Sequence, residues 1–381
     1  MADPSASSPA RRTRRTRFVC ISDTHNCTVR LPKGDVLIHC GDLTNQGSFN
    51  ELSKQVSWLE RADFECKIVV AGNHDLTLDT DFNNNNNNIH ATHGRFQTSQ
   101  GPADCQALLT GSRSLTYLVH ESRAVKLTSP SGPRTAFSVF GSPYSPARGG
   151  GAWAFQYPRP ETDDPAAAAA AARSLWGAIP LDTDVLVTHG PARTHCDDEA
   201  AAGCEVLRRQ LWRVRPRLAL CGHVHGARGA ERVRWDLESR GARYAELGRT
   251  PWRDLNPESE RNALVDLSAK GGAPLDNDGS ASLPEGVCGD SPRRESEGNA
   301  GTGDDAGTLG LGENPDSARS DRVALAGRLG RKETCVVNCA IQHSSYPHAG
   351  RGPRKLNKPI VVDLDLPMWE DEDPPEAETA A

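Results

Sequence analysis

The sequence lacks the usual marks of a membrane, secreted or disulfide-linked protein. It has no apolar run of 18 residues, and its longest apolar stretch is the alanine tract Ala166–Ala172, so we expect no membrane-spanning helix, no membrane partner and no secretory signal. Its 11 cysteines are odd in number and include no C-x-x-C pair. This pattern argues against a disulfide framework and favours a reducing, cytoplasmic compartment.

Large apolar side chains are also scarce. Hydrophobic residues make up 36% of the chain and aromatic residues 5%, while glycine and proline together number 61 (35 and 26). An ordinary globular chain is roughly 45–50% apolar. We therefore expect that part of the chain does not contribute to a folded core.

The net charge of −6 argues against nucleic acid as the main partner. Five arginines nevertheless lie within residues 11–17. We interpret residues 1–16 as a disordered basic tail, and a mitochondrial presequence is the alternative, because the segment is rich in arginine and serine and poor in acids.

Several short apolar runs end abruptly in polar residues and do not alternate, which is the pattern of buried parallel strands. Each ends beside Asp, Asn or His. They are Arg17–Ser22, Asp35–Cys40, Lys67–Ala71, Thr183–Thr188 and Leu218–Cys221.

Two helices are predicted between these strands, at Ser48–Ala62 and Gly203–Val214. Ser48 followed by Glu51 forms a capping signal for the first helix. We expect the arginines around the second helix to lie on a solvated face; phosphate binding is the alternative. They are Arg208, Arg209, Arg213 and Arg215. Alternating strands and helices indicate an α/β layered sheet.

A second, more antiparallel sheet is predicted from further strand patterns. Its candidate strands are Tyr117–Val119, Ala124–Leu127, Ala136–Phe140, Thr334–Ala340 and Ile360–Leu364.

Two polar regions interrupt the pattern. Asn83–Asn88 is an asparagine tract that we interpret as an insertion in a surface loop. Residues 256–333 are rich in Gly, Asp, Ser, Glu, Asn and Pro, and we predict a disordered insertion there, because such a segment cannot offset its ordering entropy by burial. The predicted domain therefore comprises residues 17–255 and 334–366, followed by an acidic tail at 367–381.

The polar residues at the strand ends are the candidate functional residues. Strand ends at the carboxyl edge of an open α/β sheet meet at one rim, where such sheets bind ligands. Glycine precedes three of these residues, which permits a sharp turn and close approach. The set consists of Asp23, His25, Asp42, Asn73, His189, His223 and His225.

Carboxylate, amide and imidazole ligands without thiolate suit Mn²⁺, iron or Zn²⁺ at a reactive site better than a structural zinc. Cys20, Cys40 and Cys221 lie inside the predicted strands, and we interpret them as buried small hydrophobes. Isolated histidines such as His39 and His120 are interpreted as hydrogen-bonded residues and not as ligands.

The order of these residues resembles the calcineurin-like metallophosphoesterase superfamily. Its blocks D-x-H, G-D, G-N-H-D, H-G and G-H-x-H stand at residues 23–25, 41–42, 72–75, 189–190 and 222–225. The segments 141–143, 188–191, 203–204, 214–216, 337–340 and 357–360 resemble the small metallophosphoesterase-domain-containing branch, whose animal members include cyclic nucleotide phosphodiesterases.

The resemblance implies a four-layered αββα sandwich of two mixed β-sheets flanked by helices, with a dinuclear metal centre. Asp23, His25 and His225 would hold one divalent ion. Asn73, His189 and His223 would hold the other, and Asp42 would bridge the two. His74 matches a histidine that is not a ligand and that lies near the leaving group. We expect the neighbouring Asp75 to orient an imidazole.

These assignments predict a hydrolase that acts on phosphoric ester bonds. Two divalent ions lower the pKa of a shared water, and the resulting hydroxide attacks phosphorus while His74 protonates the leaving oxygen. We expect a small phosphodiester substrate of the cyclic nucleotide type. A phosphomonoesterase or protein Ser/Thr phosphatase is an alternative, weakened because those phosphatases carry an Asp-Arg-Gly ending in their second block, where this chain has Leu43-Thr44-Asn45-Gln46-Gly47. A non-catalytic scaffold of the same fold is the other.

Overall fold

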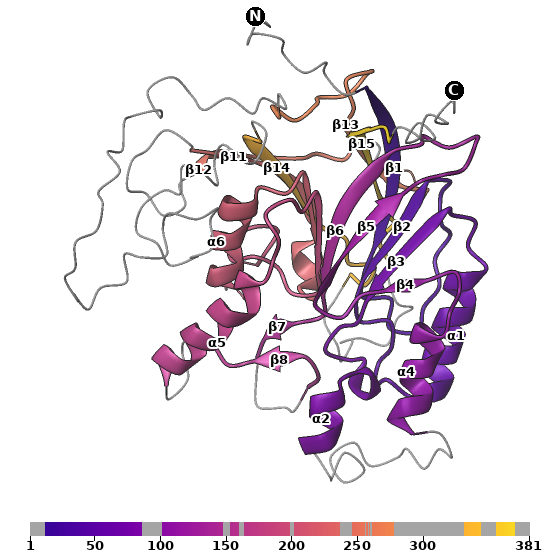
Figure 1. Ribbon diagram of the computed structural model, residues 1–381, viewed down its shortest axis with the longest axis vertical. Coiled ribbons are helices and arrows are strands. Elements are labelled where there is room, and N and C mark those ends of the chain that lie inside the picture. The colour runs from indigo at the N-terminus through magenta and orange to yellow at the C-terminus, as the bar shows by residue number, and fades with distance from the viewer. Residues whose placement is uncertain are drawn as a thin grey trace, which may run out of the picture.

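The structure is a computed structural model that describes residues 12–85, 101–147, 153–159, 164–198, 202–236, 246–255, 257, 259, 261–277, 331–343 and 356–369. Two large β-sheets face each other, and helices cover their outer surfaces (Figure 1). This arrangement confirms the predicted four-layered sandwich.

The first sheet has six strands in the order β13-β15-β1-β2-β3-β4. The strands β1 to β4 run parallel to one another, whereas β15 pairs with β1 in the antiparallel direction and β13 follows β15. Their bounds are β1 (Thr13–Ile21), β2 (Val36–Cys40), β3 (Cys66–Val70), β4 (Thr116–Tyr117), β13 (Ala263–Leu267) and β15 (Ile360–Pro367).

The second sheet has seven strands in the order β12-β11-β14-β10-β9-β6-β5. Its middle strands β14, β10, β9 and β6 are parallel, and antiparallel strands flank them on both sides. The bounds are β5 (Glu121–Lys126), β6 (Ala136–Ser142), β9 (Val185–Thr188), β10 (Leu218–Cys221), β11 (Gly229–Trp235), β12 (Glu246–Pro251) and β14 (Glu333–Asn338). A further pair of short strands is formed by β7 (Ser145–Pro146) and β8 (Gln156–Tyr157).

The helices form the two outer layers (Figure 1). The pair α1 (Phe49–Glu60) and α4 (Pro102–Thr110) covers the first sheet, and the pair α5 (Pro165–Gly177) and α6 (Glu205–Val214) covers the second. Three short helical turns complete the elements: η1 (Leu76–Leu78), α2 (Thr80–Asn85) and η2 (His225–Ala227). Among the described residues, every helix is too short or too polar to serve as a transmembrane span.

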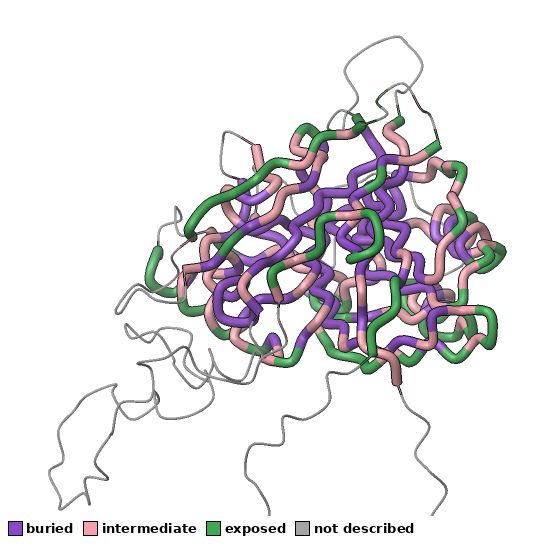
Figure 2. The backbone as a smooth tube through the Cα atoms, turned by 90° about the horizontal axis from the view of Figure 1, so that it is seen from above, coloured by how far each residue is buried: buried purple, intermediate pink, exposed green. Residues whose placement is uncertain are grey.

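Alternation of side chains along the central strands explains the layers. In β1, Phe18 and Cys20 point into the space between the two sheets, whereas Val19 and Ile21 pack under α1. Buried residues therefore run through the middle of the molecule, and exposed residues lie around it (Figure 2). Each fully buried large apolar side chain stabilises the fold by about 1.5–3 kcal/mol.

Most of the predicted strands, and both predicted helices, match the structure to within a few residues. The carboxylate of Glu51 accepts hydrogen bonds from the Ser48 amide and hydroxyl at 3.0 and 2.9 Å, as expected for the start of α1. The helices α4 and α5 and the strands β11 to β13 were not predicted. The alanine tract lies in α5, where Ala168 and Ala172 are buried.

The predicted domain boundaries need correction at three places. β1 begins at Thr13, inside the predicted tail 1–16, because it pairs with β15 along its whole length. β13 lies inside the predicted insertion 256–333, and its alternating Ala263, Val265 and Leu267 are buried against the core. β15 reaches Pro367, the first residue of the predicted acidic tail. The remaining parts of these three segments lie largely outside the described residues.

Three further expectations were wrong. β4 and β15, both expected in the second sheet, lie in the first, where β4 pairs with β3 and β15 pairs with β1. The asparagine tract begins inside α2, where the Asn83 side chain donates to three backbone carbonyls; residues 86–88 lie outside the described residues. Arg213 and Arg215 are buried and do not form a solvated face: Arg213 donates to Ile179 O after α5, and Arg215 donates to Trp212 O in α6 and to Arg331 O before β14.

Candidate metal centre

The sequence-predicted ligands all follow strand ends at one rim of the sandwich. β1, β2 and β3 of the first sheet, and β9 and β10 of the second, are each followed directly by one or two of them. A backbone hydrogen bond from Ile341 N to Ser22 O at 2.8 Å joins the rim loops of the two sheets, and Gly222 N donates to His189 O at 3.0 Å between two rim loops of the second sheet. The fold therefore brings residues that are 200 positions apart into one site.

The backbone at this rim adopts a left-handed conformation that residues other than glycine rarely take. Asp23, His25, Asp42 and His223 have φ values of 53°, 43°, 54° and 66°. Such left-handed residues cost free energy and persist where the surrounding structure holds them in place. Their concentration at the predicted ligands indicates a functional site.

Two of the glycines before these ligands are required by close packing. A Cβ atom on Gly72 would overlap the Asp42 carboxylate, and one on Gly222 would overlap the Asp23 carboxylate. Any side chain at these two positions would push the carboxylates out of the site.

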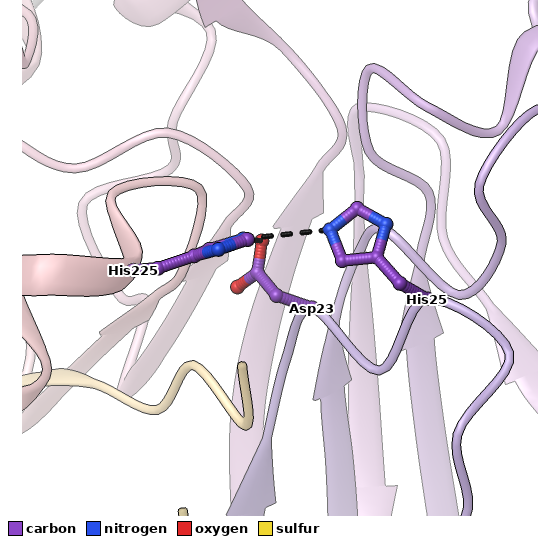
Figure 3. Close-up of side chains that lie close together, drawn as sticks. All are labelled: Asp23, His25 and His225. Atoms are coloured by element: carbon purple, nitrogen blue, oxygen red, sulfur yellow. Dashed lines mark hydrogen bonds and ion pairs between the residues drawn. The ribbon is translucent and has the colours of Figure 1, made fainter. Parts of the chain in front are cut away.

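Asp23, His25 and His225 form the first cluster (Figure 3). Their side chains approach from the first sheet and from the loop after β10. His225 Nε2 lies 3.2 Å from Asp23 Oδ1 and 3.4 Å from His25 Nε2. Asp23 and His25 are fully buried, and His225 is nearly so.

Asn73, His189 and His223 form the second cluster. Asn73 Oδ1 lies 3.0 Å from His189 Nε2, and His223 Nδ1 lies 3.2 Å from the same nitrogen. The cluster again combines residues of the two sheets, because Asn73 follows β3 whereas the histidines follow β9 and β10.

Asp42 lies between the two clusters. Its Oδ2 is 3.6 Å from His25 Nε2 in the first cluster, and its Oδ1 is 3.4 Å from His189 Nε2 in the second. The structure therefore places this carboxylate where the predicted bridging ligand should be.

The hydrogen bonds of the imidazoles show that the site suits cations. His25 Nδ1 contacts Thr44 O at 2.9 Å, and His189 Nδ1 contacts Cys40 O at 2.9 Å. A carbonyl can only accept, so each Nδ1 carries a proton, and the ring in its neutral form presents the Nε2 lone pair to the site. These lone pairs face carboxylate oxygens and other imidazole nitrogens, an arrangement that divalent cations would stabilise.

Burial favours the neutral form, which metal ions require, at two of these histidines. It lowers the pKa of His25 to about 4 and that of His223 to about 3, with neighbouring carboxylates opposing the shift. For His189 the effect of burial is outweighed by the Asp42 carboxylate, which raises the pKa to about 9. A proton and a cation therefore compete for His189 Nε2.

His74 lies beside both clusters. Its backbone N–H donates to Asp42 Oδ1 at 2.8 Å, and its ring Nδ1 contacts Asn45 O at 2.8 Å. The ring meets His25 edge-on at 4.7 Å between centroids. The side chain also falls within a possible ligand group with His25 and Asp42, so the geometry alone permits either a ligand or an acid–base role.

Asp75 has a different role from the one expected. The sequence suggested that it orients an imidazole. Its carboxylate instead accepts from the amides of Leu43, Thr44 and Gly72 at 2.9–3.2 Å and from the Thr44 hydroxyl at 2.7 Å. Asp75 therefore holds together the two loops that carry Asp42 and His74.

Residues interpreted as non-ligands have other partners. His39 contacts the Thr24 hydroxyl at 3.0 Å and His120 the Ser142 hydroxyl at 3.1 Å. Cys20, Cys40 and Cys221 are buried in the strands, and each of the ten cysteines in the described part of the chain is a free thiol.

Sequence reasoning assigned no role to two side chains at the rim. Asn338, the last residue of β14, donates to Val224 O at 2.9 Å and so supports the loop between His223 and His225. Trp153 lies 4.2 Å from His74 between ring centroids. A polar residue at the end of a buried strand was a usable signal for Asn338, whereas Trp153 stands outside any regular pattern.

The family model for calcineurin-like phosphoesterases matches residues 16–227. The chain is 42% identical over 241 residues to a protein of Emericella nidulans named probable rhamnogalacturonate lyase C, a match that covers 63% of this chain and 20% of that protein. It is 34% identical over 221 residues to human metallophosphoesterase domain-containing protein 1, covering 56% of this chain and 62% of the human protein. The chain thus spans less than two thirds of either relative.

Solved structures with a partly similar fold include TT1561 of Thermus thermophilus, with a TM-score of 0.33 and 11% identity over 58% of this chain and 84% of that one. Purple acid phosphatase PPD1 from yellow lupin has a TM-score of 0.29 and 10% identity over 67% of this chain and 43% of that one. On the sequence match, the chain belongs to the calcineurin-like phosphoesterase family, in the branch that includes human metallophosphoesterase domain-containing protein 1.

Proposed function

We propose that this chain is a metal-dependent hydrolase of phosphate esters, and that its substrates are phosphodiesters of the cyclic nucleotide type. One observation carries the proposal: two clusters of Asp, Asn and His side chains, all buried except the half-buried His223, meet at one rim with the Asp42 carboxylate between them. Membership of the phosphoesterase family supports hydrolysis as the reaction class.

The residues divide into groups with separate tasks. Asp23, His25 and His225 would hold one divalent ion, and Asn73, His189 and His223 a second, with Asp42 shared. When bound, such a pair supplies an activated water at neutral pH and offsets the charge of the phosphate. Mn²⁺, iron and Zn²⁺ all suit these ligands. We propose to test Mn²⁺ first.

His74 would donate the proton that the leaving oxygen needs. Its Nδ1 is held by the Asn45 carbonyl, which leaves Nε2 as the nitrogen that exchanges a proton with substrate. The bond from its backbone N–H to Asp42 fixes the position of His74 relative to the metal ligands. General acid catalysis of this kind contributes roughly 10²–10⁴-fold.

Two considerations support a diester over a phosphoprotein substrate. Protein phosphatases of the superfamily carry an Asp-Arg-Gly ending in their second block, whereas this chain has Leu43-Thr44-Asn45-Gln46-Gly47 after Asp42 and no arginine there. The resemblance to the branch with cyclic nucleotide phosphodiesterases points the same way. We do not transfer the lyase activity named for the Emericella protein, because the match covers a fifth of that protein.

We propose a small phosphate ester as the binding partner, and we propose neither a membrane nor a nucleic acid as a partner. We propose a cytoplasmic location, which the free thiols of the described cysteines support.

The test is hydrolysis of bis-p-nitrophenyl phosphate by Mn²⁺-loaded protein, followed by a panel of cyclic nucleotides, other phosphodiesters, nucleotides and phosphopeptides. We expect turnover of the diesters, and loss of that turnover in His225→Ala and in Asp42→Ala. Turnover no faster than in these two variants would favour a non-catalytic scaffold. Faster hydrolysis of phosphopeptides or monoesters would favour the phosphatase alternative.

A further inference from the structure

Trp153 is a large aromatic residue at the rim whose position the proposed reaction leaves unexplained. Its ring lies 4.2 Å from the His74 ring between centroids, with an angle of 42° between the planes. Trp153 is half-buried, whereas the next two residues, Ala154 and Phe155, are fully buried. Trp153 is therefore only partly covered, and its ring lies directly beside the proposed general acid.

The backbone next to Trp153 is fastened to the loop that carries the ligands. The Ala154 amide donates to Asn73 O at 3.2 Å, and the Phe155 amide donates to the Asp79 carboxylate at 2.6 Å. Phe155 O in turn accepts from Ser145 N at 3.0 Å. Because Asn73 belongs to the second cluster and precedes His74, these bonds hold the chain at Trp153 at a defined place relative to both.

Two other tryptophans show what a purely structural indole looks like in this fold. Trp176 and Trp235 are 0% and 2% exposed. Their indole N–H groups donate to the Tyr157 hydroxyl at 3.0 Å and to the Thr334 hydroxyl at 2.9 Å. Trp153 differs from them because it combines partial exposure with contact to a site residue. Partly exposed indole surface at a site is the kind that stacks on flat ligands.

We propose that Trp153 is the aromatic wall of the substrate site, and that it stacks on a nucleobase attached to the leaving group of the phosphoester. This inference rests on the proposed function, because it places the leaving group beside His74. In a 3′,5′-cyclic nucleotide the leaving oxygen belongs to the ribose that carries the base, so a base on Trp153 and a leaving oxygen near His74 belong to one nucleoside. Stacking selects bases in general and makes little distinction among them.

The experiment compares two inhibitors that differ by the base alone. Adenosine monophosphate and ribose 5-phosphate are titrated as competitive inhibitors of bis-p-nitrophenyl phosphate hydrolysis by the Mn²⁺-loaded full chain. We expect adenosine monophosphate to bind at least about fivefold more tightly, the lower end of what one base–aromatic stack contributes. Equal inhibition by the two compounds would overturn the proposal.

Variants then assign the difference to Trp153. Trp153→Leu keeps an apolar side chain against the core but removes the ring, and we expect the affinity ratio of the two inhibitors to fall towards one. Trp153→Phe should restore part of the ratio, because a smaller ring still stacks. Trp58→Phe is the matched control, since Trp58 is a half-buried tryptophan in α1, and the ratio should stay at the wild-type value. An unchanged ratio in Trp153→Leu would assign Trp153 to packing against His74 only.

The outcome is separable from the proposed function. If the Mn²⁺-loaded protein does not hydrolyse the diester, the proposed function fails, and calorimetric titration with the same two compounds still measures the ratio. If hydrolysis proceeds and the ratio is one, the function stands and the role of Trp153 fails. If the Trp153→Leu variant does not fold, the affinity ratio of the two inhibitors in the wild-type protein and in Trp153→Phe tests the proposal.

Discussion

The two clusters of the candidate metal centre are built from different chemical groups. The first cluster combines a carboxylate, Asp23, with two imidazoles, whereas the second combines an amide, Asn73, with two imidazoles. Asp42 faces both clusters. Because the first cluster carries the additional negative charge, we expect it to hold its ion more tightly and the second cluster to exchange its ion more readily.

The largest effect should come from removing the residue that the clusters share. Asp42→Ala removes a ligand from both, and its carboxylate also accepts the His74 amide. We expect kcat/KM to fall by about 10³-fold or more, the scale at which loss of a principal charge-stabilising group is felt. Metal content measured by mass spectrometry should fall well below two ions per chain. Full metal content with full activity would show that Asp42 does not join the clusters.

Removing the proposed acid should separate catalysis from metal binding. His74→Ala should lower kcat by roughly 10²–10⁴-fold, because the leaving oxygen then departs without a proton donor. The metal content of this variant should match that of the wild-type protein. Loss of an ion would instead make His74 a ligand, the alternative that its distance to His25 and Asp42 leaves open.

Changing the charge of either cluster should reduce the difference between their affinities. Asp23→Asn removes the carboxylate from the first cluster, and Asn73→Asp adds one to the second. In Asp23→Asn we expect the smaller of the two Mn²⁺ dissociation constants to rise by roughly tenfold or more. In Asn73→Asp we expect the larger one to fall by roughly tenfold or more. Isothermal titration measures both constants. Identical isotherms in both variants and in the wild-type protein would contradict the charge argument.

A smaller, pH-dependent effect is expected outside the clusters. The imidazole of His195 lies 2.7 Å from Glu231 and 3.0 Å from Glu246, and these carboxylates raise its pKa although burial lowers it. A raised folded-state pKa stabilises the protein fully below the unfolded-state value of about 6.5, and this contribution is lost as the pH rises through the folded-state pKa.

His195→Gln should therefore lower the melting temperature by a few degrees at pH 6, where one kcal/mol corresponds to about 2–4 °C for a domain of this size. The difference from the wild-type protein should shrink by pH 9. Glu246 stays charged over this range, because its pKa is lowered to about 2: burial raises it, but the bonds from His195 and Arg208 outweigh that effect. A difference that grows with pH would contradict the assigned charge on His195.

The central strands and the ligands could be predicted because their signals are local. An apolar run such as Leu218–Cys221, ending in Gly222 and His223, reports both burial and the turn. The pairing of strands that lie far apart in the sequence is not set by local signals. Nothing in Ala263–Leu267 indicates that it pairs with Ile360–Leu364, about 97 positions later, so a strand was taken for part of a disordered insertion.

Side chains that act through tertiary contacts were also beyond prediction. Asp75 looked like a partner for an imidazole because it follows His74, yet the fold turns it towards the amides of Leu43 and Thr44. Arg215 was expected to be solvent-exposed at the end of a helix. It is buried, and it donates to the backbone carbonyl of Arg331, which lies in a distant segment of the chain. In both cases the partner is set by packing and not by neighbouring sequence.

The most direct test is anomalous X-ray scattering from crystals of the Mn²⁺-loaded protein. The account predicts two manganese peaks at the rim, one bound by Asp23, His25 and His225, the other by Asn73, His189 and His223, and both in contact with Asp42. A single peak, or peaks bonded to other residues, would contradict it.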